Sequence, residues 1–129
     1  MAGGASNYLE SKILDHVLRV SSYSQPAALY VALYTSDPGD GDSGTEVSGG
    51  DYSRVSVTFG SASNGTSSNS AAVEFSTATA NWGTITHVGI RDASTAGNLL
   101  FYGPLTSSVT INTNDIFRFP IGDLQVSLD

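Results

Sequence analysis

The sequence contains no cysteine and few basic residues, and both shortages narrow what the protein can do. Without cysteine the chain forms no disulfide and no thiolate site, so neither oxidising export nor cysteine chemistry is supported. Lysine and arginine together number 5 against 12 aspartates and glutamates, which gives a formal net charge of −7. Because affinity for nucleic acid comes mostly from basic side chains on phosphates, we expect no nucleic-acid partner.

Long hydrophobic runs are also missing. No run approaches the roughly 18 apolar residues of a membrane span, and no basic segment precedes a hydrophobic one. We therefore expect no membrane partner, and synthesis in the cytoplasm without a classical export signal. Charged residues make up only 13% of the chain, about half the ~25% usual in soluble domains. Serine, threonine, glycine and asparagine replace them, which favours a neutral polar surface that lies partly against other subunits.

What the chain does contain is a series of short β-type runs. The run from Trp82 to Asp92 is rich in β-branched residues, has apolar side chains on both faces, and includes Gly83 and Gly89. Such a strand usually lies in the middle of a sheet, where a neighbouring side chain or backbone approaches closely. Alternation places Thr84, Thr86, Val88 and Ile90 on one face and Ile85 on the other.

Turn residues separate this central run from seven others, at residues 28–34, 54–59, 71–75, 99–102, 108–111, 116–119 and 124–128. The pattern predicts a mainly β fold, an antiparallel β-sandwich or jelly-roll of about eight strands. We expect one β-sandwich domain over residues 1–129, with long polar loops at 35–50 and 60–70. The first residues, 1–5, read as a flexible start.

One amphipathic helix is predicted over residues 6–20, ahead of the β domain. Asn7 is the expected N-cap, with Glu10 three residues later. Leu9, Ile13, Val17 and Val20 form an apolar stripe that Leu14 and Leu18 widen. The helix has two possible uses: it caps the end of its own sandwich, which we favour, or it lies in the groove of a neighbour.

The sequence gives little support for a metal-binding or catalytic site. Asp37, Asp40, Asp42 and Glu46 are oxygen donors for calcium, but their spacing does not match a calcium-binding loop, and a solvated loop with turns explains them better. No strained serine elbow accompanies His16 or His87, so we expect a solvent-facing and a structural histidine rather than a catalytic base. We therefore expect no enzyme activity, no catalytic, cofactor-binding or metal-binding residues, and no cofactor. The residues of any binding site are not evident.

Carbohydrate binding is a third possibility, because tyrosines stack on sugar rings. Six tyrosines are available, although the sequence does not show that they cluster: Tyr8, Tyr23, Tyr30, Tyr34, Tyr52 and Tyr102.

Several blocks in order, at residues 6–18, 29–34, 44–54, 68–73 and 82–88, resemble a family of small tailed-bacteriophage virion proteins. The resemblance extends over nearly the whole chain, from Ser6 to Asp129. Proteins of this kind are commonly labelled tail fibre proteins, and comparable small β proteins serve as capsid cement or decoration.

The resemblance implies a non-enzymatic structural protein that is located in the virion and has other virion proteins as partners. Our preferred interpretation is a capsid cement protein that oligomerises, as a homotrimer by analogy, and stabilises the head by binding the major capsid protein. The alternative is a tail fibre or tail-adaptor protein, including a host-glycan-binding tip.

Overall fold

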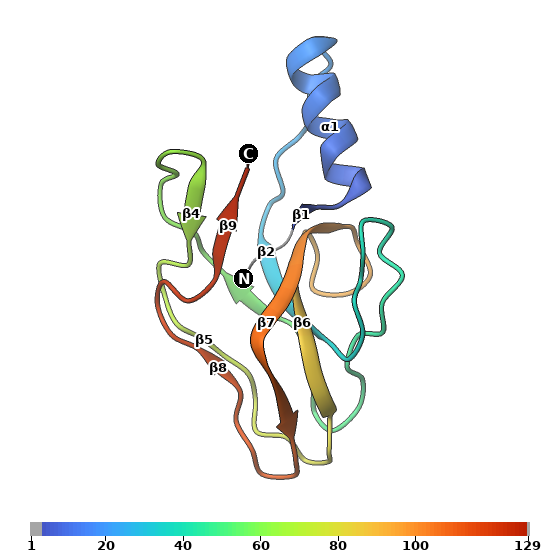
Figure 1. Cartoon of the computed structure of the whole chain (residues 1–129), viewed down its shortest axis with the longest axis vertical. Coiled ribbons are helices and arrows are strands. Elements are labelled where there is room, and N and C mark those ends of the chain that lie inside the picture. Colours follow the sequence, from blue (N-terminus) through green and yellow to red (C-terminus); the bar gives the residue numbers. More distant parts are fainter. Residues whose placement is uncertain (1–3, 129) are drawn as a thin grey trace.

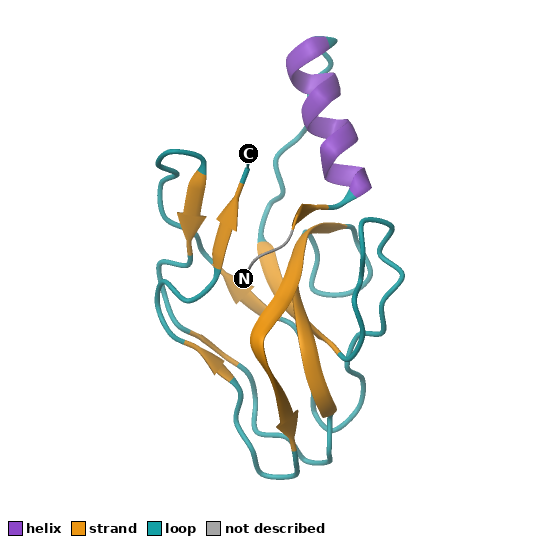
Figure 2. Ribbon diagram, viewed as in Figure 1, coloured by secondary structure: helices purple, strands orange, loops and turns teal. Residues whose placement is uncertain are grey.

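A computed structural model describes residues 4–128 of the chain. It contains one helix, α1 (Asn7–Leu18), and nine strands. The strands are β1 (Gly4–Ala5), β2 (Leu29–Tyr34), β3 (Val55–Val57), β4 (Thr66–Ser68), β5 (Val73–Glu74), β6 (Gly83–Arg91), β7 (Leu99–Ile111), β8 (Arg118–Phe119) and β9 (Gln125–Ser127). The mainly β, antiparallel architecture with one helix confirms the predicted fold class (Figure 2).

Five strands form one antiparallel sheet in the order β1-β7-β6-β2-β3, and two short ribbons, β4–β9 and β5–β8, lie beside it (Figure 1). β6 is the middle strand, as its sequence predicted. The strand requires a glycine at Gly89, because a Cβ at this position would lie 2.8 Å from Leu99 Cδ1 and 2.9 Å from Tyr34 Cε2.

The predicted alternation along β6 is wrong at one point. The pairing of β6 with β7 shifts between Ile85 and His87, which is a β-bulge or a similar irregularity. An extra residue in one strand reverses the side-chain alternation beyond it. As a result Ile85 lies in the same core cluster as Val88 and Ile90, rather than on the opposite face.

β7 also differs from the prediction, which broke it at Gly103–Pro104 into two short strands. The structure has one continuous strand of 13 residues. Pro104 pairs with His87 at the irregularity in the ladder. A proline lacks a backbone N–H and is tolerated in a sheet at such an interruption, so the strand continues through it.

The main core lies between one face of the sheet and the β5–β8 ribbon, which is a sandwich-like arrangement. Val31, Val88 and Ile90 from the sheet share this core with Val73 and Phe119 from the ribbon. Trp82 packs in the same core. Its indole is 5% exposed, and Nε1 donates a hydrogen bond of 2.9 Å to the Gly50 carbonyl. On the opposite face of the sheet, Ala32, Tyr34 and Leu99 form a smaller cluster.

Two segments expected to be irregular contain strands. Within the predicted loop at residues 60–70, β4 pairs with β9 near the other end of the chain. Within the predicted flexible start, Gly4 and Ala5 form β1 and pair with β7, while residues 1–3 lie outside the described part. Both strands depend on partners more than 55 residues away in sequence, and local sequence patterns carry no information about such pairing.

The helix is shorter than the predicted range of 6–20, and its N-cap is Ser6 rather than Asn7. The Ser6 hydroxyl accepts a hydrogen bond from the Leu9 amide and donates one to the Leu99 carbonyl. The helix ends at Leu18 because Val20 adopts a left-handed conformation with φ 56°. The Ser21 amide then bonds back to the Asp15 carbonyl, which closes the last turn. No helix within residues 4–128 is long and apolar enough to cross a membrane.

Candidate interaction surface

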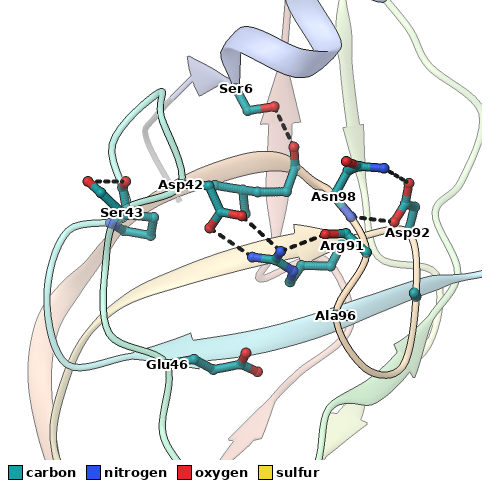
Figure 3. Close-up of polar contacts among 12 residues, drawn as sticks. Ser6, Asp42, Ser43, Glu46, Arg91, Asp92, Ala96 and Asn98 are labelled. Carbon is teal, nitrogen blue, oxygen red and sulfur yellow. Dashed lines mark hydrogen bonds and ion pairs between the residues drawn. The ribbon is translucent and has the colours of Figure 1, made fainter.

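The acidic loop predicted as a possible calcium site is instead fastened by arginines. Arg91, on β6, donates hydrogen bonds of 2.9 and 2.8 Å to the two carboxylate oxygens of Asp42 (Figure 3). It also donates to the Tyr34 hydroxyl and the Gly97 carbonyl. Burial opposes the charged guanidinium, but these hydrogen bonds outweigh it and raise the pKa of Arg91. The result is a permanently charged clamp between loop and sheet.

A second arginine, Arg54, joins two parts of the same loop, just before β3 begins. Arg54 Nε and Nη2 donate to the two carboxylate oxygens of Glu46 at 2.9 and 2.8 Å, and the Tyr52 hydroxyl donates to the same carboxylate at 2.7 Å. Burial disfavours the charged carboxylate, but the bonds from Arg54 and Tyr52 prevail and lower the pKa of Glu46. Arg54 also donates to the carbonyls of Ala93 and Ala96, tying the turn after β6 to the loop.

The other two acids of the predicted calcium set have separate partners. Asp37 accepts a hydrogen bond from the Gly39 amide, and Asp40 accepts one from the Tyr102 hydroxyl. The bond to Asp40 raises the pKa of Tyr102 to about 12. No group of three or more histidines, aspartates or glutamates that would hold a metal occurs in the described part of the chain. Sequence reasoning missed the two arginine clamps, although the need to neutralise arginines beside apolar strands pointed to them.

The histidines lie apart from each other. His16, on α1, accepts a hydrogen bond from the Tyr23 amide. His87, on β6, is hydrogen-bonded through Nδ1 to the Thr86 hydroxyl at 2.8 Å, and its Nε2 lies 3.7 Å from Asp37. His87 is therefore held in a polar structural contact, and His16 is exposed to solvent, both as predicted.

The tyrosines do not share one environment. Tyr34 and Tyr52 are buried or nearly so, and their hydroxyls are bonded to Arg91 and Glu46 within the protein. Burial raises the pKa of both phenols. Side chains held in this way are not available to stack on a sugar. Glycan binding by the remaining tyrosines stays a prediction.

The most distinctive surface of the molecule is the outer side of α1. Helix α1 stands out from the β body (Figure 1), and its only buried side chain is Leu9, which packs with Ala5 and Leu100. Further along the helix, the side chains of Leu14, Val17 and Leu18 are 56%, 65% and 72% exposed. The prediction that the helix caps its own sandwich therefore holds only for its first turns. We call Leu14, Val17 and Leu18 the helix stripe.

A concave apolar surface lies at the base of the helix. It has a volume of about 290 Å³ and is lined almost entirely by apolar atoms. Its walls come from β2 and β7 on one side, with Leu29 and Phe101, and from β9 on the other, with Val126 and Leu128. Phe59 and Ala62, at the start of the loop before β4, also line it. We call this surface the apolar groove; because its walls come from segments far apart in the chain, no sequence pattern could have revealed it.

The protein thus presents an antiparallel β body in which Arg54 and Arg91 fasten loop segments through Glu46 and Asp42, together with apolar surface left open to solvent. Exposed apolar surface of this kind is typical of structural proteins that act through contacts with other chains. Residues 4–127 match the model of the family described as Podophage GP4 fiber I protein gp80. The chain belongs to this family, and is a fibre-type structural protein located in the phage virion. No curated protein matches the chain.

Proposed function

We propose that this protein is a self-assembling module of a virion fibre, which joins copies of itself and attaches them to other virion proteins. The observation that carries the proposal is the exposed helix stripe, whose three large apolar side chains are more than half exposed. Large apolar side chains grouped on one face of a solvent-exposed helix mark a surface that another chain covers.

The polar groups support the same function. The two arginine clamps engage the carboxylates of Asp42 and Glu46: Arg91 joins the loop between β2 and β3 to the sheet, and Arg54 ties two parts of that loop together. A rigid loop layer suits a protein that must present a fixed surface to neighbours. Family membership supports a fibre rather than another part of the particle.

Labelling of intact virions with gold-conjugated antibody against the purified chain tests the fibre assignment. We expect gold particles along or at the base of the fibres. Labelling of the head shell alone, or purified virions that lack the polypeptide, would contradict the proposal. Virions grown without the gene provide the control, since they should lose both the label and the fibres that contain this chain.

A second candidate function is that of a capsid cement protein bound to the major capsid protein. The observation that favours it is that the described chain folds into a β body without the elongated repeats of a fibre shaft. The cement function predicts that the purified protein binds expanded heads that lack this protein and raises the resistance of the heads to heat. Equal heat resistance with and without bound protein would end this alternative.

A further inference from the structure

The helix stripe and the apolar groove have matching chemistry. The stripe is convex and purely aliphatic, with side chains spaced three and four residues apart on one face. The groove is concave, and no charged residue lines it. Burying one against the other removes apolar surface from water and desolvates no ion, which is the condition under which such contacts are stable.

The helix cannot reach its own groove with the stripe. Leu9 anchors the first turns to Leu100, and Leu100 itself is part of the groove wall. Leu18 lies about 14 Å further along the helix axis than Leu9. Helix α1 packs on β1 and β7 and extends away from the body (Figure 1). Each copy therefore holds its stripe beyond its own groove, in a position that another molecule can meet.

A second copy of the same chain fits as that molecule, because every copy carries the complementary groove and the charge around the helix permits the approach. The chain as a whole has a net charge of −7, so copies repel one another over most of their surface. The segment around the helix is balanced, because Lys12 and Arg19 offset Glu10 and Asp15. The helix can thus approach an acidic neighbour without net repulsion, and the groove that receives it is neutral.

We propose that the helix stripe of one copy docks into the apolar groove of a second copy. This inference rests on the proposed function, of which it specifies the self-assembly contact. The contact is heterologous, since it joins different surfaces of the two molecules. Every copy carries one stripe and one groove, so a closed ring of copies occupies all of them without leaving a free end.

Two variants with matched charge test the two sides of the contact. L14E/L18E adds two negative charges to the stripe, and A62E/L128E adds two to exposed residues of the groove. Each should reduce the mass measured by sedimentation from a multiple of 13.4 kDa to 13.4 kDa. The control S61E/Q125E changes the net charge by the same amount at exposed positions outside both surfaces, and should keep the wild-type mass.

Mixing the two variants separates this contact from other modes of association. L14E/L18E retains an intact groove and A62E/L128E retains an intact stripe, so an equimolar mixture should form a heterodimer through one remaining contact. If the helices instead associated with each other, A62E/L128E would stay oligomeric and the mixture would form no heterodimer. Either result, or a wild-type chain that is monomeric at every concentration, would overturn the proposal.

Cross-linking covers the case in which a glutamate variant fails to fold. Because the chain has no cysteine, L18C and A62C each introduce a single thiol. A short bis-maleimide reagent should link an L18C chain to an A62C chain in a mixture. Links only between two L18C chains, or no links, would contradict docking in the groove. The outcome is independent of where the protein lies in the virion, so failure of the contact and failure of the fibre assignment are distinguishable.

Discussion

Individual side chains determine how firmly the loop between β2 and β3 is held to the sheet. Arg54 and Arg91 are both about 8% exposed, and each binds a loop carboxylate through two nitrogens. The paired carboxylate compensates the charge of each guanidinium, although the buried Nε of Arg91 has no hydrogen-bond partner; with its carboxylate removed, the charge would be left without compensation. These contacts give two predictions at the scale of single residues.

The first concerns Glu46 and pH. Its pKa is lowered from the ordinary value of 4.5 in the folded protein, so the ion pair stabilises the fold above that pH and is lost as the pH falls through the folded value. Glu46→Gln should therefore lower the free energy of unfolding at neutral pH by about 2 kcal/mol, and the difference from wild type should shrink below pH 4.5.

Urea unfolding across this pH range measures the effect. Glu74→Gln is the control, because Glu74 is exposed and lies 4.0 Å from an exposed Arg118; its effect should stay within about 0.5 kcal/mol. Equal losses for the two variants would show that the Glu46 clamp adds nothing to stability.

The second prediction concerns Gly89. A methyl group there would press on Leu99 and on Tyr34, whose hydroxyl is bonded to Arg91. Gly89→Ala should lower the free energy of unfolding by about 1–3 kcal/mol through overpacking. Gly41→Ala, which adds a methyl group with no heavy atom within 4 Å, is the control and should be nearly neutral. Thermal unfolding compares them, and a neutral Gly89→Ala would disprove the close approach.

At the scale of elements, α1 depends on one buried hydroxyl. Ser6→Ala removes the bond to the Leu9 amide and leaves the Leu99 carbonyl without its side-chain donor. We expect a loss of about 1–2 kcal/mol and faster amide hydrogen exchange along α1. Asn7→Ala is the control, because Asn7 is exposed and is not the cap. A larger effect at Asn7 than at Ser6 would contradict the observed capping.

The same elements show what sequence alone can predict. The central position of β6 and the amphipathic helix follow from local periodicity and from glycine placement. The irregularity at Ile85–His87 and the passage of β7 through Pro104 do not, because both depend on the match between two strands. The helix stripe was visible in the sequence, but the apolar groove was not, since Leu29 and Leu128 meet only in the folded chain.

At the scale of the whole molecule, an acidic surface and an apolar contact have opposite effects. Net charge keeps free subunits apart, while the stripe and groove attract. Association should therefore strengthen as salt screens the repulsion between copies. Sedimentation at low and high salt measures this, and oligomers that dissociate on addition of salt would point to an ionic contact instead.

The most direct measurement is the mass of the full wild-type chain in solution over a wide range of concentrations. Assembly of copies through α1 predicts a discrete species whose mass is a whole-number multiple of 13.4 kDa and which L14E/L18E abolishes. A single species of 13.4 kDa at every concentration, or an oligomer unchanged in L14E/L18E, would contradict it.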